Sequence, residues 1–407
     1  MQAETDAVAA GFIPERLARI DSHFAKYVED GRLPGWLTMI SRGGQLAHLS
    51  CHGRRDAEAE LPVEEDTLFR IYSMTKPITS VAALMLYEEG AFELTDPVAD
   101  FIPSFADMRV FRGGTAAKPV TVPATEPVRI WHLLTHTAGL TYGFHYVHPV
   151  DEMYRKAGFE WGQPRDYDLA GCCDAWAAQP LLFEPGSEWN YSVATDVLGR
   201  VVEVASGQSL ADFFAQRILG PLKMTDTTFQ VTGDDLNRLA ALYVPDPQTG
   251  KILRNDAAGK GITREPRMHS GGGGLASTAG DYMRFARMLL GGGELDGVRL
   301  LGRRTVDYMA TNHLPGGADL ESFGRKLFAE TRFDGVGFGL GVSVTVNPAD
   351  YKTMTSVGEF SWGGAASTAF WIDPSEDLAV VFLTQLLPSS THPLRTQLRQ
   401  LVYQALA

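Results

Sequence analysis

The sequence predicts an α+β fold, in which an antiparallel sheet flanked by helices is built from both ends of the chain and interrupted by a mainly helical insertion. Three observations predict it. Strand patterns gather near the two ends of the 407 residues, helical patterns lie at both termini, and further helical patterns fill the middle. We therefore expect a sheet domain of residues 1–95 and 266–407, a mainly helical domain of residues 96–265, and an active site in the cleft between them.

The strand signals are short apolar runs bounded by turn residues. Near the start, residues 37–42 and 45–50 flank Gly43 and Gly44, which suit a two-residue hairpin turn. Residues 374–377, Pro-Ser-Glu-Asp, form a second turn near the other end. Because short connections join antiparallel neighbours, we expect an antiparallel sheet. The strand runs near the end of the chain are residues 341–346, 367–373 and 378–385.

The helical signals are apolar residues repeated every three to four positions. Residues 14–30 and 392–405 have this pattern, so each terminal helix can cover a face of the sheet. Stretches rich in Pro, Gly and aromatic residues separate the helices of the middle region, which is typical of an inserted subdomain. The remaining helical patterns are residues 128–134, 193–206, 209–219 and 279–290.

The composition excludes several classes of function. A formal net charge of −13 provides no basic face for phosphate backbones or anionic bilayers, so we expect neither nucleic-acid nor membrane binding. No run reaches the ~18 to 20 apolar residues that span a bilayer, and residues 1–30 lack a signal-peptide pattern, which favours a cytoplasmic protein. Cys51, Cys172 and Cys173 suit neither a disulfide framework nor a metal site. The oligomeric state is left open.

Ser73 and Lys76 are the first candidates for chemistry. Ser73 precedes a helical run, residues 78–89, so it is expected at a helix N-terminus, where free N–H groups favour developing negative charge. Residues three apart share a helix face, which lets the Lys76 amine reach the Ser73 hydroxyl. A partly desolvated lysine with a lowered pKa can take the serine proton. The same spacing also occurs at ordinary solvated helix ends.

Pro77 predicts a local irregularity beside this pair. Proline cannot donate a backbone hydrogen bond, and it restricts the residue before it, here Lys76. We therefore expect the helix opening at Ser73 to be tight or irregular for one turn and to become regular α-helix beyond Ile78.

Tyr191 is the second candidate, at the junction between a turn-rich loop and the helical pattern that begins near Val193. A phenol there can face a cleft and act as general acid or base if the Lys76 charge lowers its pKa. The alternative interpretation is a core tyrosine with a satisfied hydroxyl.

The third candidate is the segment of residues 361–365, Ser-Trp-Gly-Gly-Ala, which precedes a predicted strand. Gly363 and Gly364 would let a substrate approach the backbone of an edge strand. The N–H groups of Ala365 and Ser73 are then candidate oxyanion donors. The alternative is a strand bulge.

In their order and spacing these elements resemble the serine β-lactamase and penicillin-binding-protein superfamily, and more closely the class C β-lactamase-like esterases called family VIII carboxylesterases. The resemblance extends from about Gly11 to Ala405. It implies a serine hydrolase in which Ser73 is acylated while Lys76 and Tyr191 move protons. The further segments that carry it are residues 133–140 (Leu-Leu-Thr-His-Thr-Ala-Gly-Leu), 184–192, 218–224 (Ile-Leu-Gly-Pro-Leu-Lys-Met) and 271–278.

Two departures from the lactamase pattern bear on the substrate. Where that pattern has Tyr-x-Asn, this chain has Val193 in the place of the asparagine, which removes an amide that holds a β-lactam. Where it has Lys-Thr-Gly, this chain has Trp362, Gly363 and Gly364, and an indole offers one donor and a large apolar face instead of a cation. A carboxylate-bearing substrate therefore loses its anchor, whereas a neutral ester loses nothing.

The remaining candidates carry less weight. His136 invites a triad interpretation, but the resemblance implies a structural loop. Residues 271–274 form a Gly-rich loop without a following Lys-Ser/Thr, so phosphate binding is not expected. Tyr142 and Phe144 are candidates for the substrate pocket, although they fit the packing of a long loop equally well. The same stretch also contains Tyr146, Tyr154, Phe159 and Trp161.

The function we expect is hydrolysis of small neutral esters of short-chain acids, with no cofactor or metal and with weak β-lactam opening as a side activity. The alternatives are a β-lactamase, D,D-peptidase or acyltransferase on the same scaffold, and a non-catalytic acyl-binding sensor. If a carboxylate were anchored after all, Arg264, Arg267 and Lys326 would be the first cations to consider.

Overall fold

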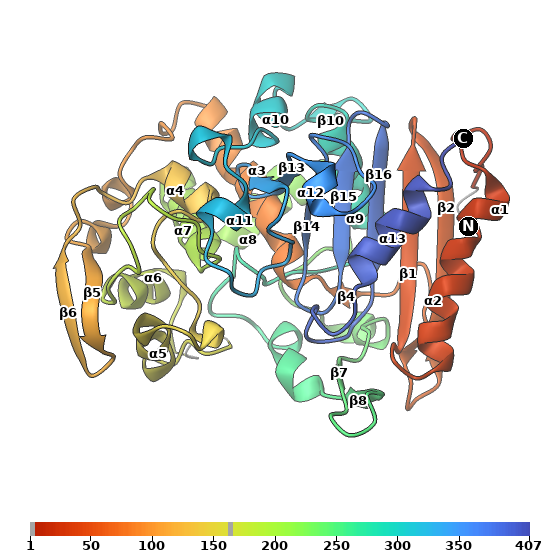
Figure 1. Cartoon of the computed structure of the whole chain (residues 1–407), viewed down its shortest axis with the longest axis horizontal. Helices are drawn as coiled ribbons and strands as arrows, with labels where there is room; N and C mark the ends of the chain where they lie inside the picture. The colour runs from red at the N-terminus through yellow and green to blue at the C-terminus, as the bar shows by residue number, and fades with distance from the viewer. Residues whose placement is uncertain (1–4, 162–165) are drawn as a thin grey trace.

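An eight-stranded antiparallel sheet organises the molecule, as the computed structural model shows for residues 5–161 and 166–407 (Figure 1). The strand order is β12-β13-β14-β15-β16-β1-β2-β3. Pairing of β1 with β16, with Leu37 opposite Leu383, joins the two ends of the chain in one sheet. The predicted α+β fold is therefore confirmed. The strands are β1 (Gly35–Arg42), β2 (Gln45–Asp56), β3 (Leu61–Pro62), β12 (Val336–Phe338), β13 (Ser343–Thr345), β14 (Phe360–Gly363), β15 (Ala369–Asp373) and β16 (Leu378–Leu383).

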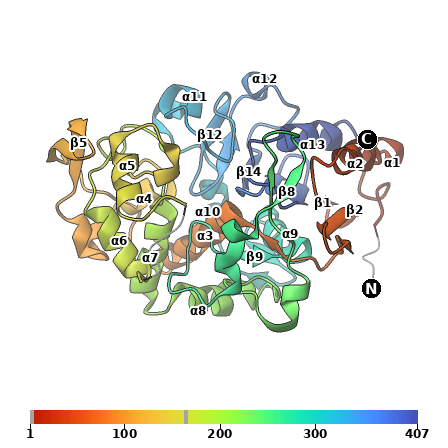
Figure 2. The ribbon, with the colours of Figure 1, turned by 90° about the horizontal axis from the view of Figure 1, so that it is seen from below.

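Helices cover both faces of this sheet. The helices α1 (Pro14–Leu17), α2 (Arg19–Glu29) and α13 (Leu394–Tyr403) lie together on one face, and α9 (Ala279–Leu290) lies on the other (Figure 2). Side chains alternate along β1 accordingly. Trp36 and Ile40 pack in the core under α2 and α13, whereas Leu37 and Met39 belong to the main core of the molecule.

The helical half of the molecule surrounds α3 (Thr75–Glu88), whose residues from Thr75 to Leu86 are all buried. It packs mainly against α7 (Ala194–Ser206). The other helices of this half are α4 (Ile130–Leu134), α5 (Pro149–Lys156), α6 (Leu169–Ala177) and α8 (Leu210–Phe214), and α8 continues as a π-helical turn over Ala215–Leu219. The hairpin of β5 (Arg109–Thr115) and β6 (Lys118–Pro123) lies at the far left of Figure 1.

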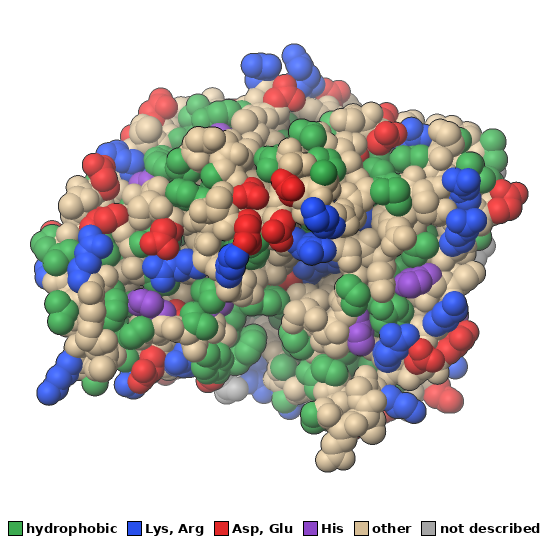
Figure 3. All heavy atoms as spheres, in the orientation of Figure 1, with side chains coloured by type: hydrophobic (Ala, Val, Ile, Leu, Met, Phe, Trp, Pro, Cys, Tyr) green, Lys and Arg blue, Asp and Glu red, His purple; other side chains and the backbone are tan. Residues whose placement is uncertain are grey.

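Short elements complete the chain. They are β4 (Phe69–Arg70) paired with β9 (Ala276–Ser277), β7 (Tyr243–Pro245) paired with β8 (Ile252–Arg254), β10 (Glu294–Leu295) paired with β11 (Val298–Arg299), and the helices α10 (Arg303–Met309), α11 (Leu320–Phe323) and α12 (Pro348–Tyr351). No helix in the described residues is long and apolar enough to cross a membrane. On the face shown in Figure 3, acidic and basic side chains are interspersed.

Several predicted boundaries move for local reasons. The hairpin at Gly43 and Gly44 is present, and both glycines have the positive φ that a tight two-residue turn needs. The first helix breaks at Ala18 into α1 and α2. The strand predicted from residue 367 starts at Ala369, because Ser367 has a φ of +68° within a turn. The hairpins β5–β6 and β7–β8 were not predicted from the sequence.

A buried ion pair links α13 to the residue that precedes β14. Arg399 of α13 donates from Nη2 to Glu359 Oε1 at 2.9 Å, and their side chains are 4% and 1% exposed. Tyr403 on the same helix donates its hydroxyl to Glu359 at 3.1 Å. Glu359 immediately precedes β14, so the pair fixes the position of α13 against this strand.

We predict that Arg399→Met lowers the free energy of unfolding by about 3 to 5 kcal/mol, because it leaves the Glu359 carboxylate buried without its cation. Chemical denaturation of the whole protein measures this loss. The double variant Glu359→Leu with Arg399→Met should recover much of it, and Arg332→Met, at an exposed arginine, should change stability by less than about 0.5 kcal/mol. A loss for Arg399→Met as small as that of Arg332→Met would contradict the prediction.

Candidate active site

Ser73 lies on a 3₁₀ turn, Tyr72–Met74, that leads directly into α3. The tight opening agrees with the expectation from Pro77. Regular α-helix nevertheless begins at Thr75, three residues earlier than expected. Pro77 is the third residue of α3, where an N–H has no intrahelical acceptor in any case, so the helix loses no hydrogen bond there.

Three side chains from two segments meet at Ser73. Lys76 Nζ lies 3.3 Å from Ser73 Oγ, and the Tyr191 hydroxyl donates to the same oxygen at 2.7 Å. Lys76 is one turn further along, whereas Tyr191 comes from the loop that leads into α7. Ser73 is half-buried, and the other two are almost completely buried. The structure therefore brings together the three residues that the sequence singled out.

The Lys76 amine is held in a dry environment. Burial lowers its pKa from the ordinary lysine value to about 8, against the opposing effect of the carboxylates of Asp196 and Glu330. Nζ donates to the carbonyl oxygen of Gly272 at 2.6 Å. A neutral amine with one N–H committed to Gly272 keeps a lone pair for the Ser73 proton. The geometry thus suits a general base.

Tyr191 differs from the expectation that the Lys76 charge would lower its pKa. Burial raises the pKa of this phenol well above its ordinary value, and the charge of Glu330 raises it further. The hydrogen bond with Ser73 acts in the opposite direction but is outweighed. The resting form is therefore a protonated phenol that donates to Ser73, which suits a general acid.

Trp362, Gly363 and Gly364 lie at the end of β14 and in the turn after it. β14 is not an edge strand, because β13 and β15 pair with it on either side. However, β13 reaches only as far as Ser361, so Trp362 and Gly363 pair with β15 alone among the described residues. The expectation of an edge strand is wrong for β14 as a whole and holds only for this end.

Close packing within the protein explains Gly363 and Gly364 better than substrate access does. A Cβ at Gly363 would lie 2.2 Å from Nη2 of Arg395, and a Cβ at Gly364 would lie 2.2 Å from the carbonyl oxygen of Ile71. The strand thus packs backbone-to-backbone against the segment just before Ser73. Gly364 is therefore required by the backbone of Ile71, whereas a side chain at Gly363 would displace the guanidinium of Arg395.

The turn that follows β14 contains Ala365 and packs against the segment just before Ser73. Gly364 N donates to Thr368 O at 3.0 Å, and Ser367 N donates to Gly364 O at 3.0 Å, which closes the turn. Within the described part of the chain, neither Ala365 N–H nor Ser73 N–H has a protein acceptor. Ala365 is half-buried, and its N–H stays a candidate oxyanion donor.

The aromatic candidates lie against Tyr191. Its ring centroid is 5.2 Å from that of Tyr142 and 5.4 Å from that of Trp362, and Tyr142 stacks on Phe144 at 4.6 Å. Val193, in contrast, is a buried core residue that caps α7. It is not among the side chains that meet at Ser73.

His136 does not form a triad. Its Nδ1 lies 3.1 Å from Ser192 Oγ, and its ring packs among Trp189, Tyr191 and Phe338. Burial lowers the pKa of this histidine well below its ordinary value, with the Lys76 charge acting in the same direction. It is a neutral packing residue behind Tyr191.

Asp196 is a residue that sequence reasoning missed. Its buried Oδ1 accepts hydrogen bonds from Ser270 Oγ at 2.6 Å and Gly272 N at 2.9 Å. Gly272 is the residue whose carbonyl holds Lys76, so Asp196 fixes the Gly-rich loop of residues 271–274 against the amine. The sequence offered only an acidic residue in the first turn of an apolar helix.

Arg395 is the second residue that was missed. It reaches Gly363 and Gly364 from α13, and Nη2 donates to Gly364 O at 3.0 Å and to Thr368 O at 2.9 Å. The cations named from the sequence lie elsewhere: Arg264 and Arg267 are exposed, and Lys326 pairs with Glu321 at the surface. Arg395 lies 31 residues from Gly364 in the sequence, so only the folded structure shows that the two are in contact.

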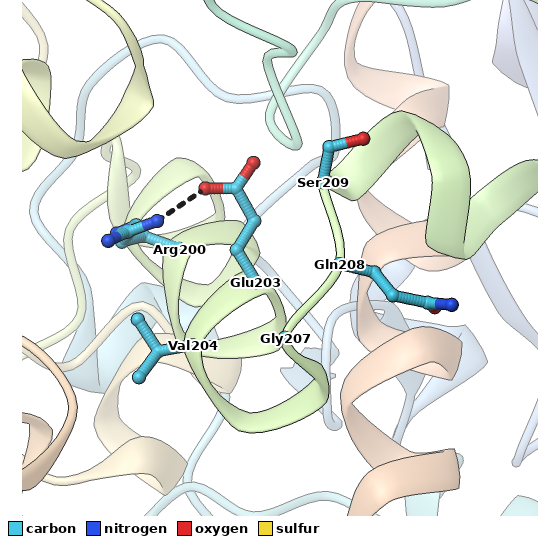
Figure 4. A pocket seen from close by; sticks show the side chains of 6 residues that line it. All are labelled: Arg200, Glu203, Val204, Gly207, Gln208 and Ser209. Atoms are coloured by element: carbon cyan, nitrogen blue, oxygen red, sulfur yellow. Dashed lines mark hydrogen bonds and ion pairs between the residues drawn. The ribbon is translucent and has the colours of Figure 1, made fainter.

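Another depression in the described part of the chain lies away from Ser73. Figure 4 shows a depression lined by Arg200, Glu203 and four neighbours at the C-terminal end of α7. This helix has 13 residues, so the depression lies roughly 20 Å along it from Tyr191. Glu203 already pairs with Arg200 and accepts from Leu210 N. In residues 5–161 and 166–407, no group of three or more His, Cys, Asp and Glu side chains is arranged to hold a metal ion.

This arrangement of serine, buried lysine and phenol is typical of active-site serine enzymes. Residues 20–404 match the Beta-lactamase family, and the chain belongs to that family. It is 40% identical over 361 residues to Protein Rv1367c of Mycobacterium tuberculosis (strain ATCC 25618 / H37Rv), covering 88% of this chain and 87% of that one. It is 32% identical over 404 residues to Esterase EstB of Burkholderia gladioli, covering 95% of each.

The solved structures agree. EstCE1, a hydrolase with promiscuous acyltransferase activity, superposes with a TM-score of 0.81 at 26% identity, covering 97% of this chain and 100% of its own. The resemblance read from the motifs is thus confirmed. The protein is a serine hydrolase or acyltransferase on the β-lactamase and penicillin-binding-protein scaffold.

We predict that Asp196→Asn shifts the ionisation of Lys76 to lower pH. The carboxylate stabilises the ammonium form, so its removal lowers the pKa of Lys76 below about 8, while the asparagine oxygen can still accept from Gly272. The rate at which a fluorophosphonate labels Ser73 as a function of pH reports this ionisation, because only the neutral amine activates the serine.

The matched control is Asp174→Asn, at an exposed carboxylate on α6, which should leave the midpoint of the labelling curve unchanged. An unchanged or higher midpoint for Asp196→Asn would show that this carboxylate does not act on Lys76.

Proposed function

We propose that the protein is a serine carboxylesterase that hydrolyses small neutral esters of short-chain acids through an acyl-enzyme on Ser73. The observation that carries the proposal is the double engagement of Ser73 Oγ, by the Lys76 amine at 3.3 Å and by the Tyr191 phenol at 2.7 Å. The similarity to EstB, which bears the name of an esterase, supports it.

In the acylation step, Lys76 is the base. Its neutral amine takes the Ser73 proton as Oγ attacks the ester carbonyl, and the N–H groups of Ser73 and Ala365 stabilise the oxyanion. Tyr191 then gives its proton to the departing alkoxide, and the ammonium of Lys76 returns a proton to the phenolate. The Lys76 Nζ atom lies 4.8 Å from the Tyr191 ring centroid, which is close enough to stabilise the phenolate meanwhile.

Deacylation runs through the same groups in reverse, with water in the place of the alcohol. Water attacks the acyl carbon and loses its proton to Tyr191, whose own proton passes to Lys76. Lys76 then protonates Ser73 Oγ as the carboxylic acid leaves, and the starting forms are restored. Transfer to an alcohol is the same step with another acceptor, so acyltransfer is the second candidate, in line with the activity stated for EstCE1.

A preference for esters over β-lactams follows from the strand beside the nucleophile. Trp362 stands where the lactamase pattern has a cation, and Arg395, the cation nearest to this strand, is already engaged by two carbonyl groups and by Glu330. A lactam carboxylate that became buried here would lose hydration and would meet only a guanidinium whose charge Glu330 already compensates. A neutral ester avoids that cost.

We predict that Ser73→Ala abolishes ester hydrolysis, and that Lys76→Ala and Tyr191→Phe each lower kcat by about 10² to 10⁴, the usual loss for a general base or acid. Initial rates with p-nitrophenyl butyrate measure all three, and circular dichroism checks the fold. Residual activity of Ser73→Ala within tenfold of wild type would mean that another nucleophile operates. A burst that stops at one equivalent in the wild type would indicate an acyl-binding sensor.

We predict that p-nitrophenyl acetate or butyrate exceeds a chromogenic cephalosporin in kcat/KM by about two orders of magnitude or more, because a cost of a few kcal/mol falls on the carboxylate alone. Both substrates are assayed on one enzyme preparation, with p-nitrophenyl decanoate included to read the tolerance for longer acids. Comparable efficiencies for lactam and short ester would replace the esterase assignment with a lactamase.

A further inference from the structure

Arg395 brings a positive charge directly beside the strand that borders Ser73. Its Nη2 bonds to Gly364 O and Thr368 O, the two ends of the turn that presents the Ala365 N–H. The Arg395 side chain is 19% exposed, so part of it remains accessible. A partly buried arginine at this position would ordinarily attract a substrate carboxylate.

Glu330 cancels this charge from the protein side. Its Oε2 accepts from Arg395 Nη2 at 2.6 Å and from Ser389 Oγ at 2.9 Å, and its backbone oxygen accepts from Nη1 at 2.6 Å. The glutamate side chain is only 1% exposed. The Glu330 carboxylate is therefore more deeply buried than the Arg395 side chain with which it pairs.

The pair borders a cavity of about 350 Å³ that reaches the active-site strand. Its wall includes Trp362, whose ring contacts Tyr191, as well as Ser361, Ser389 and Arg395. The charge of Glu330 is also close enough to raise the pKa of Lys76 and of Tyr191. Trp362 is thus shared between the wall of this cavity and the surroundings of Tyr191.

The other charged groups that line the cavity do not change the net charge of its buried wall. Arg399 is paired with Glu359, and burial lowers the pKa of His392, so this imidazole is neutral near pH 7. Arg332 has no ion-pair partner among the described residues, but it is exposed, where water screens its charge. The buried wall is polar and close to electrically neutral.

We propose that this cavity receives the part of the substrate that extends past Trp362, and that Glu330 is the specificity-determining residue that makes it select uncharged hydrogen-bonding groups, such as a carboxamide, hydroxyl or second ester, over carboxylates. The proposal rests on the ester hydrolysis proposed above. Arg395 supplies N–H donors to a neutral acceptor, and the buried carboxylate removes the net attraction for an anion.

The test compares two half-esters of glutaric acid, mono-p-nitrophenyl glutarate and its carboxamide isostere, which differ in charge and little in shape. In the wild type, the carboxamide should have the higher kcat/KM. Glu330→Gln keeps an oxygen that accepts from Arg395 and Ser389 but leaves the guanidinium charge uncompensated. The ratio of carboxylate to carboxamide efficiency should then rise by about tenfold or more, as expected for a close charge pair.

Two variants control for indirect effects. Arg332→Gln removes the exposed cation and should change the ratio less than about threefold. The double variant Glu330→Gln with Arg395→Gln removes both charges and should return the ratio to near the wild-type value, which also covers the case in which Glu330→Gln alone folds poorly. A ratio that is the same in wild type and Glu330→Gln, both folded, would overturn the proposal.

Binding separates this proposal from the proposed function. In Ser73→Ala, calorimetric affinities for the two half-esters report the charge preference without turnover. If the wild type hydrolyses neither ester but Ser73→Ala still prefers the carboxamide, and adding Glu330→Gln reverses that preference, the esterase assignment fails and the charge selection stands. If p-nitrophenyl butyrate is hydrolysed but binding shows no charge preference, the esterase assignment stands and the charge selection fails.

Discussion

The burial of one lysine amine is the constraint on which the rest of the site depends. Lys76 belongs to a helix that is buried over most of its length, and its Nζ has the carbonyl of Gly272 and the hydroxyl of Ser73 as its hydrogen-bond partners. An ammonium ion without full solvation is costly in such a place, so the amine is partly neutral near physiological pH. The packing of α3 in the core is therefore also what makes Lys76 a base.

The need to hold the Lys76 amine in place explains the Gly-rich loop of residues 271–274 and the buried Asp196. The Gly-rich loop of residues 271–274 gave no phosphate-binding pattern, and its glycines instead allow close packing. A Cβ at Gly272 would lie 2.4 Å from Asp196 Oδ2, and a Cβ at Gly271 would lie 2.9 Å from Thr195 O. Asp196 on α7 thus holds the loop, and the loop holds Lys76. The contact between α3 and α7 positions the chemistry as well as stabilising the fold.

The sequence predicted what depends on short-range pattern. The three-residue spacing of Ser73 and Lys76 determines their distance, because both lie on one turn, and Gly43-Gly44 determines a hairpin. The antiparallel sheet could be predicted from the strand runs at the two ends. The complete set of its strands could not, because β12 is only three residues long and has little pattern of its own.

Residues whose role depends on contacts distant in sequence escaped prediction. Asp196 acts on a loop more than 70 residues away, and Arg395 acts on β14 from the C-terminal helix. The two glycines of the Trp-Gly-Gly segment could be read from the sequence as places of close approach. What approaches, a guanidinium and the carbonyl of Ile71, becomes clear only once α13 and the Ser73 turn are placed beside the strand.

Burial has opposite effects on the pKa values of the two proton-transfer groups. It disfavours whichever form is charged, so it lowers the pKa of Lys76 to about 8 and raises the pKa of Tyr191. Tyr191 therefore rests as a neutral phenol, and a fraction of Lys76 is a neutral amine near physiological pH. A neutral amine can only accept the serine proton, and a neutral phenol can only donate. The nearby carboxylates Asp196 and Glu330 raise both values, which keeps Lys76 close to pH 8 while making Tyr191 a still weaker acid at rest. Tyr191 therefore gives up its proton readily only when the ammonium of Lys76 has formed beside it. In the proposed mechanism this orders the two transfers: the serine proton moves first, and the leaving group is protonated second.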